Sequence, residues 1–344
     1  MRIIIPSIQV PFIKGGSILM TDGLKKALDK FGYETEIVTI PFKFFPASSI
    51  SETIDFCSQQ DFNDFNGYKV DCIIALQFPA YYVRHDKKII WLMHQHRAAY
   101  DLLGTSSDSI EEDVRDKIVK YDNREFVQHR KMYCMSKNIA RRLKKFNNIE
   151  AKPLYHPPYG EDKFFCEDSY GYIFYPSRLE KLKRQDLLLK SLKHTKTKVK
   201  VLISGTGSQH YGYQRLIKKL GVGDKVKLLG YISEKEKYVL YSRSLAVFFG
   251  PYDEDYGYVT LEAMLSQKPV ITCGDSGGPL EFVIDSENGC IIKPDPKTIA
   301  EKIDWLYLNK GKAKKMGKAG RELYLSKKIS WDNVVTKLTN LGGI

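Results

Sequence analysis

Two glutamates eight residues apart, Glu254 and Glu262, carry the clearest chemical signal in this 344-residue sequence. They lie in the segment PYDEDYGYVTLEAM, which starts at position 251, after an apolar run at residues 245–249. The pattern predicts a strand, then a loop that carries Glu254, then an amphipathic helix that Gly257 opens and that holds Glu262. A carboxylate accepts hydrogen bonds from vicinal hydroxyl groups, and a helix N-terminus offers amides to an anion. The segment therefore indicates a site for a ligand that has both hydroxyl groups and negative charge.

Two basic residues, Arg178 and Lys183, follow another predicted strand at residues 172–175. Both are positioned to reach a diphosphate, Arg178 through its fork of donors and Lys183 as a point charge. The alternative is that Lys183 and Arg184 begin a solvated helix.

Glycine loops add weaker signals at two places. Gly15 and Gly16, preceded by Lys14, lie between the first predicted strand and the first predicted helix, and Gly205 and Gly207 follow a later strand. Glycines allow a phosphate to approach the backbone closely, and a helix N-terminus favours its charge. Taken alone, such loops are more often ordinary turns.

The elements that must position these residues alternate along the whole chain. Strands are predicted at residues 2–5, 35–40, 70–76, 88–93, 131–135, 172–175, 199–204, 225–229, 245–249, 269–273 and 289–292. Helices are predicted at residues 17–31, ended by Gly32, at 136–146, with Ser136 as the N-cap, and at 183–193, 214–220, 234–241 and 257–266. The strands are rich in Val, Ile and Phe with little alternation, as in parallel strands covered on both faces. This order predicts two doubly wound parallel sheets, with a junction in residues 156–168 and ligands beyond the carboxyl ends of the strands.

Length and composition fit this α/β organisation. The length suits two globular domains, and no apolar run approaches the ~20 residues of a membrane-spanning helix. Residues 1–13 are interrupted by Pro6, Gln9 and Pro11, so we expect a buried strand and not a signal peptide. The six cysteines are scattered without a CxxC pair, which argues against a structural zinc site or a disulfide scaffold and favours a reducing, cytoplasmic location.

The net charge of +13 is unevenly distributed. Residues 1–168 hold 24 Lys+Arg against 23 Asp+Glu, whereas residues 169–344 hold 30 against 18. Most of the excess lies in lysine-rich helical stretches such as residues 310–318, for which a solvated face is the simpler interpretation. In the first half, one predicted helix carries Lys137, Arg141, Arg142, Lys144 and Lys145 beside Ala140, Leu143 and Phe146. It is either an ordinary solvated helix or a contact of residues 137–145 with an anionic membrane surface.

In this order, the motifs resemble those of the family 4 retaining glycosyltransferases, whose signature is Glu-x7-Glu in the context E-x-[FY]-G-x-x-x-x-E-A. The resemblance extends over almost the whole chain. Besides the residues already named, it rests on Leu228-Leu229-Gly230, Lys268-Pro269-Val270, Gly277-Gly278-Pro279-Leu280-Glu281 and Asn288-Gly289. It implies the GT-B fold, in which two Rossmann-like domains with doubly wound parallel sheets face a central cleft. Residues 1–160 would form the acceptor-side domain, residues 161–328 the nucleotide-sugar-binding domain, and residues 329–344 a helix that crosses back to the first domain.

The resemblance also implies roles for individual residues. Glu262 would hold the ribose hydroxyls, Glu254 a hydroxyl of the donor sugar, and Arg178 and Lys183 the diphosphate. The implied substrate-binding set comprises Gly15, Gly16, Gly205, Gly207, Ile232, Tyr256, Gly257, Tyr258, Val259, Thr260 and Glu262. Within it, the base would lie near Ile232, and Gly16 would contact the phosphates from the opposite domain when the cleft closes.

A histidine near the reacting sugar is a further feature of the family. His94 and His96 flank Gln95 just after the predicted strand at residues 88–93, and His94 is preferred because it comes first after the apolar run. The implied catalytic set is therefore His94, Glu254, Arg178 and Lys183. Asp253-Glu254-Asp255 also spells the metal-binding DxD pattern, but Glu254 already has a place in the family signature, so we expect an enzyme without a metal or another cofactor.

The function implied is retaining transfer of a hexosyl or N-acetylhexosaminyl group from a UDP- or GDP-linked sugar to a hydroxyl of a glycan or lipid-linked acceptor. We expect a cytoplasmic enzyme, either free or peripheral on the inner face of the membrane. Two alternatives remain: a GT-B-type nucleotide-sugar epimerase, and a catalytically silent basic scaffold that binds membrane or nucleic acid. No nucleic-acid-binding motif is present, so nucleic acid is not an expected partner.

Overall fold

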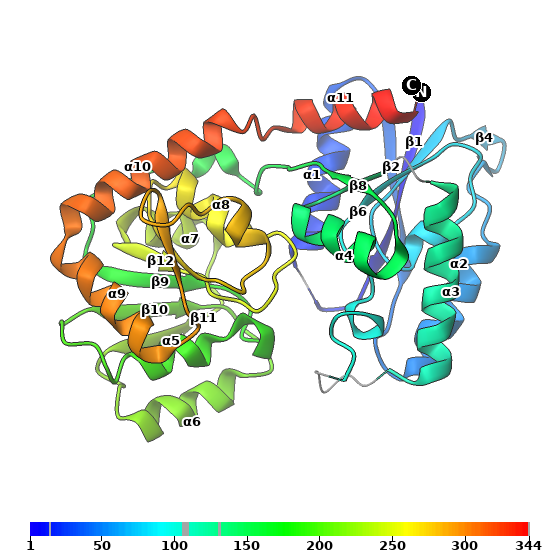
Figure 1. Cartoon of the computed structure of the whole chain (residues 1–344). Coiled ribbons are helices and arrows are strands. Elements are labelled where there is room, and N and C mark those ends of the chain that lie inside the picture. Colours follow the sequence, from blue (N-terminus) through cyan, green and yellow to red (C-terminus); the bar gives the residue numbers. More distant parts are fainter. Residues whose placement is uncertain (14, 105–109, 130–131, 343–344) are drawn as a thin grey trace. The chain divides into compact units, whose positions relative to one another are not determined.

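The chain forms two compact units in a computed structural model (Figure 1). Unit 1 comprises Met1–Tyr159 and Ile329–Ile344, and unit 2 comprises Gly160–Lys328. The structure describes the whole chain except residues 14, 105–109, 130–131 and 343–344. Lys14 of the predicted glycine loop therefore lies outside the described residues, as does residue 131 of a predicted strand.

Unit 1 is built on a six-stranded parallel sheet with the strand order β2-β1-β5-β6-β7-β8. Its strands are β1 (Arg2–Gln9), β2 (Glu34–Pro41), β5 (Cys72–Ala75), β6 (Lys88–Leu92), β7 (Met132–Cys134) and β8 (Ala151–Pro153), and β3 (Asp64–Phe65) and β4 (Tyr68–Lys69) form a small antiparallel hairpin. Its helices are α1 (Gly16–Lys30), α2 (Ala47–Gln59), α3 (Glu112–Gln128), α4 (Lys137–Asn147) and α11 (Trp331–Gly342). In Figure 1 the helices cover the sheet, which accounts for the almost fully apolar sequences of the central strands β5 and β6.

Unit 2 repeats this architecture with the parallel order β11-β10-β9-β12-β13-β14. Its strands are β9 (Tyr172–Pro176), β10 (Lys200–Ser204), β11 (Val226–Gly230), β12 (Ala246–Phe248), β13 (Val270–Cys273) and β14 (Gly289–Ile292). Its helices are α5 (Gln185–Ser191), α6 (His210–Leu220), α7 (Glu234–Arg243), α8 (Tyr258–Leu265), α9 (Pro296–Leu308) and α10 (Lys310–Ser326). Two parallel sheets covered by helices confirm the predicted α/β class.

Local sequence signals set several of these boundaries. The Ser136 hydroxyl accepts a hydrogen bond from the Ile139 amide at 3.1 Å, which confirms Ser136 as the N-cap of α4. Gly32, with φ +86°, follows the last turn of α1, in a conformation that suits glycine. Asp295 caps α9 through the Thr298 amide at 2.9 Å, and Pro296 occupies its first turn.

Three sequence predictions differ from the structure. Helices α2, α3 and α9, strand β8 and the β3–β4 hairpin were not predicted; the strands among them have only two or three residues each. The helix predicted at residues 183–193 begins only at Gln185, since Arg184 has a left-handed backbone (φ 52°) that separates α5 from a 3₁₀ turn at Lys181–Lys183. Helix α8 is not amphipathic, because all residues from Thr260 to Leu265 are buried.

The basic surface predicted on α4 is smaller than the sequence suggested. Arg142 and Leu143 are buried, because the apolar stripe of α4 packs into unit 1. Arg142 and Leu143 are therefore not part of the surface through which residues 137–145 would contact a membrane. Its exposed basic residues are Lys137, Arg141, Lys144 and Lys145.

Helix α11 completes unit 1 from the far end of the sequence. The Trp331 ring lies over Gly23 of α1, where a Cβ atom would come within 2.4 Å of it. Trp331 also packs edge-on against Trp91 of β6, with ring centroids 6.4 Å apart. The indole thus fixes α11 to both α1 and the sheet, at a place where only glycine leaves room.

Candidate active site

Beyond the carboxyl edge of the unit 2 sheet, an ammonium and a carboxylate meet from distant parts of the sequence. The Nζ atom of Lys183, in the turn after β9, donates a hydrogen bond to Oε2 of Glu254, in the loop after β12. Both side chains are about one-fifth exposed, at 18% and 21%. The Glu254 backbone is held in turn by hydrogen bonds with Ser276 (2.9 Å) and Gly278 (2.8 Å). The structure thus brings two predicted site residues together with opposite charges.

Arg184 is a neighbour of this pair that the sequence analysis treated only as the start of a solvated helix. Its guanidinium donates to both Asp275 carboxylate oxygens, at 2.8 and 2.7 Å, and to the carbonyl oxygens of Gly250 (2.9 Å) and Pro251 (2.7 Å). Burial alone lowers the pKa of Arg184, but the hydrogen bonds and the charge of Asp275 outweigh it and raise that pKa. Arg184 therefore clamps the loops after β9, β12 and β13 to one another.

Arg184→Met is expected to lower the free energy of unfolding of unit 2 by about 2–3 kcal/mol, because Asp275 and two carbonyl groups lose a charged donor. Urea denaturation followed by circular dichroism measures this. Lys181→Met is the control, since Lys181 is an exposed residue of the same turn. Equal midpoints for the two variants would contradict the assigned role of Arg184.

Glu262 is buried in the middle of α8 and is held by two side chains of α7. Its Oε1 accepts from Lys237 Nζ at 2.9 Å, and its Oε2 accepts from the Tyr241 hydroxyl at 2.7 Å. Burial lowers the pKa of Lys237, but Glu262 and Glu234 together raise it above its usual value. Each Glu262 oxygen has a second lone pair, so the carboxylate is oriented by α7 and can still accept from a ligand hydroxyl.

The start of α8 depends on close backbone packing. Gly257 is the N-cap, with φ 86°, and a Cβ atom there would lie 3.0 Å from the Pro279 side chain. Tyr256 is buried, and its ring packs edge-on against that of Tyr258, with centroids 5.4 Å apart. The first turn has no side-chain cap and no acidic residue, which suits an approaching anion. Val259 and Thr260 continue this turn.

Gly205 and Gly207 have a packing role in the structure. A Cβ atom on Gly205 would lie 2.1 Å from the Ser177 carbonyl oxygen, and one on Gly207 would lie 2.5 Å from that of Leu179. The two glycines therefore let the loop after β10 lie against the loop after β9, which carries the exposed Arg178. Ile232 lies just beyond the carboxyl end of edge strand β11, two residues before α7 begins.

The remaining predicted residues belong to unit 1, beyond the carboxyl ends of β1 and β6. Gly15 is the N-cap of α1, and Gly16 is its exposed first residue. His94 is exposed, and its Nδ1 donates to the Gln95 carbonyl oxygen at 2.8 Å, so that Nε2 is the acceptor of the neutral ring. His96 packs against Phe78, and burial lowers its pKa to about 4. Of the two histidines, His94 is thus the one that presents its ring to solvent.

A buried hydrogen-bond network behind His94 was not predicted. Asp122 of α3 accepts from the hydroxyls of Tyr81 and Tyr82 at 2.6 Å each and from that of Tyr100 at 2.7 Å. Burial raises the pKa of Asp122 to about 6, although the three hydroxyls oppose the shift. The side chain of Gln95, next to His94, donates to Asn147 at the end of α4. These contacts fix the loop after β6.

Comparison with known proteins shows a similarity of unit 2 to one family. A family model described as "Glycosyl transferases group 1" matches residues 162–323, which is nearly all of unit 2. Alpha-1,3/1,6-mannosyltransferase ALG2 of Homo sapiens is 35% identical over 114 residues, which are 33% of this chain and 27% of that protein. The chain spans less than half of the length of the curated relatives that it matches.

Solved structures share the fold over the whole chain. Sucrose-phosphate synthase from Thermosynechococcus elongatus superposes with a TM-score of 0.79 at 16% identity and covers 98% of both chains. HepE of Anabaena, solved in complex with UDP and glucose, gives a TM-score of 0.70 at 16% identity, over 99% of this chain and 100% of that one. Residues 162–323 are therefore similar to the group 1 glycosyltransferase family, and the chain has the GT-B fold.

Proposed function

We propose that the protein is a retaining glycosyltransferase that moves a hexosyl or N-acetylhexosaminyl group from a UDP- or GDP-sugar to a hydroxyl of a glycan or lipid-linked acceptor. The ion pair between Lys183 and Glu254, beyond the carboxyl edge of the unit 2 sheet, is the observation that carries this proposal. A donor sugar linked to a diphosphate needs a cation and a hydroxyl acceptor side by side. Similarity to ALG2, a mannosyltransferase, and to HepE, which was solved in complex with UDP and glucose, supports the proposal.

In the proposed reaction, charge builds on the leaving nucleoside diphosphate. Arg178, Lys183 and the first amides of α8 would stabilise this charge, and Glu262 would hold the ribose. The acceptor hydroxyl attacks the anomeric carbon on the face that the diphosphate leaves, and a diphosphate oxygen takes its proton. The new glycosidic bond therefore keeps the configuration of the bond that breaks. Through Nε2, His94 would accept a hydrogen bond from a sugar hydroxyl.

Incubation with a panel of nucleotide-sugars and acceptors is expected to release nucleoside diphosphate, and NMR of the product should show retained anomeric configuration. Release should continue in EDTA, because positive side chains and helix amides would do the work of a metal. Loss of release in EDTA and its recovery with manganese would contradict the metal-free mechanism and restore the DxD interpretation of residues 253–255. A new sugar isomer without diphosphate release would identify the epimerase, and absence of turnover and of nucleotide binding would identify the silent scaffold.

We also propose that α4 contacts an anionic membrane surface electrostatically. No described helix is both long enough and apolar enough to cross a bilayer. Because Leu143 is buried, apolar insertion of α4 is not part of the proposal, and its exposed cations supply the attraction. Lys144 pairs with Glu150 at 3.2 Å, which offsets part of its charge. The other exposed cations of α4 are Lys137, Arg141 and Lys145.

Flotation with phosphatidylglycerol vesicles is expected to recover the protein at low salt and not at high salt, because ions screen exposed charges over ~10 Å at 0.1 M. Replacing Lys137, Arg141 and Lys145 by Ser should weaken binding, at ~1 kcal/mol per residue. The matched control replaces three exposed lysines of α10, Lys312, Lys315 and Lys318. If the two triple variants float equally well, α4 is not the contact.

A further inference from the structure

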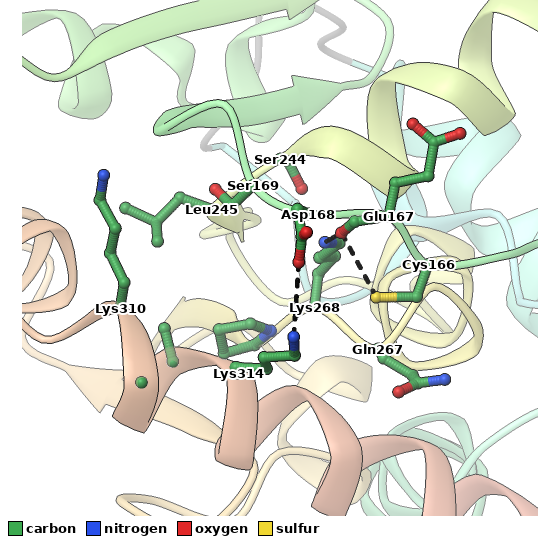
Figure 2. Close-up of a pocket in the computed structure, with 13 residues that line it drawn as sticks. Cys166, Glu167, Asp168, Ser169, Ser244, Leu245, Gln267, Lys268, Lys310 and Lys314 are labelled. Carbon is green, nitrogen blue, oxygen red and sulfur yellow. Dashed lines mark hydrogen bonds and ion pairs between the residues drawn. The ribbon is translucent and has the colours of Figure 1, made fainter.

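A pocket of about 280 Å³ lies in unit 2 at the amino ends of β12 and β13, the opposite edge of the sheet from the candidate active site. Figure 2 shows its lining, which comes from the segment before β9, the residues preceding β12 and β13, and the first turns of α10. Lys268 and Lys314 supply two ammonium groups to it, and Leu245, Pro269 and Ala313 supply apolar surface. The ammonium of Lys310 points away from them in Figure 2 and lies over the Tyr307 ring, 5.2 Å from its centroid. The proposed glycosyl transfer uses none of these residues.

Lys268 is the unusual member of this lining, because its side chain is buried. It is 5% exposed, and its Nζ donates to the Glu167 carbonyl oxygen at 2.9 Å. The acidic side chains of the pocket pair with other cations, Glu167 with Arg243 at 2.5 Å and Asp168 with Lys314 at 3.4 Å. Within the described part of the chain, Lys268 thus has no carboxylate partner. A buried ammonium of this kind is costly unless an anion compensates it.

The surroundings add further positive potential. Helix α10 starts at the pocket with no side-chain cap and no acidic residue in its first turn, although a helix N-terminus favours negative charge. Lys314, in the second turn of α10, adds its ammonium to the lining. Asp168, the carboxylate beside Lys314 in Figure 2, has a side chain that is 94% exposed and is therefore easily displaced by a ligand. Burial lowers the pKa of Lys268, although Cys166 and the charge of Asp168 oppose the shift.

We propose that this pocket binds a phosphate group, with Lys268 at its base and Lys314 at its mouth. A phosphate dianion offers acceptors to both ammonium groups, and charge-assisted hydrogen bonds to phosphate are among the stronger polar contacts in proteins. The ligand is either free phosphate or a phosphomonoester. The apolar surface beside the lysines would contact the organic part of a phosphomonoester.

Cys166 provides a local probe, because it lines the pocket and is the exposed cysteine of the chain, while the other five are buried. Its Sγ lies 3.6 Å from the carbonyl oxygen that accepts from Lys268. Inorganic phosphate should slow the alkylation of Cys166 by iodoacetamide. The rate is measured by mass spectrometry of the intact protein, and chloride keeps the ionic strength constant. The same experiment is repeated with glycerol 3-phosphate. Protection at a lower concentration than inorganic phosphate requires would identify a phosphomonoester as the ligand, and protection at an equal or higher concentration would identify free phosphate.

Lys268→Met is expected to raise the half-protecting concentration of phosphate about tenfold or more. Rates are compared with and without phosphate in each variant, so that a change in basal thiol reactivity cancels. Lys314→Met, at an exposed position, is the second variant and should weaken protection about threefold, which is a smaller loss because its charge is solvated. Lys318→Met, on the same helix but outside the lining, should behave as the wild type. Absence of protection, or equal protection in Lys268→Met and Lys318→Met, would overturn the proposal. Neither result bears on sugar transfer at the other edge of the sheet.

Discussion

Lys183→Met is expected to lower the turnover number about 100-fold at saturating donor, because preorganised charge on the leaving group is among the largest contributions to such reactions. Methionine keeps the length of the side chain and removes its charge. The ammonium is in place before the donor arrives, since Glu254 holds it and the turn at Lys181–Lys183 is fixed by the clamp of Arg184. Single-turnover kinetics with a nucleotide-sugar measure the effect on the chemical step.

Two controls separate a direct role of Lys183 from an indirect one. Lys181→Met tests the loss of a positive charge from the same turn, and we expect a nearly unchanged rate. Glu254→Gln and the double variant complete a mutant cycle. If Lys183 only positions Glu254, the double variant is no slower than the slower single variant. If Lys183 acts on the diphosphate, its loss also weakens binding of nucleoside diphosphate more than binding of the nucleoside. A rate within threefold of wild type in Lys183→Met would remove it from the catalytic set.

Glu262→Gln is expected to weaken binding of the donor nucleotide by about 1.5–3 kcal/mol, the cost of losing charge-assisted hydrogen bonds. Calorimetry with UDP and GDP gives the affinities. The ribose assignment makes a finer prediction, which is that the variant discriminates less between UDP and its 2′-deoxy analogue than the wild type does. Unchanged affinity together with unchanged discrimination would show that Glu262 does not bind the ribose.

The environment of Glu262 requires a structural control for this experiment. Glutamine in its place leaves the ammonium of Lys237 with only Glu234 as a carboxylate partner, at 2.9 Å. Some loss of affinity therefore arises from rearrangement of α7. Tyr241→Phe removes one hydrogen bond to Glu262 and keeps its charge, so it reports the effect of orientation alone. We expect its affinity to lie between those of the wild type and Glu262→Gln.

The sequence was sufficient to predict the two sheets, because every parallel strand except the edge strand β8 coincides with a local apolar run. It was also sufficient to predict that Lys183 and Glu254 each lie beyond the carboxyl end of a strand, but not that these strands, β9 and β12, are neighbours. It was not sufficient to find Arg184 as a clamp, since its partner Asp275 is 91 residues away in the sequence. Arg142 illustrates the same limit, because a cluster of basic residues on one helix does not reveal which of them faces the core. Burial and long-range pairing depend on the tertiary fold.

Unit 1 is formed by two segments that are far apart in the sequence, and this has a consequence for synthesis of the chain. Trp331 and the rest of α11 belong to unit 1, yet they leave the ribosome only after all of Gly160–Lys328. At ~5–20 residues per second, translation of that intervening part takes about 10–30 s. During this time the space over Gly23 and Trp91 lacks the indole that fills it in the finished protein. Unit 2 is continuous in sequence and has all its own strands and helices earlier, so the unit that is begun first is completed last.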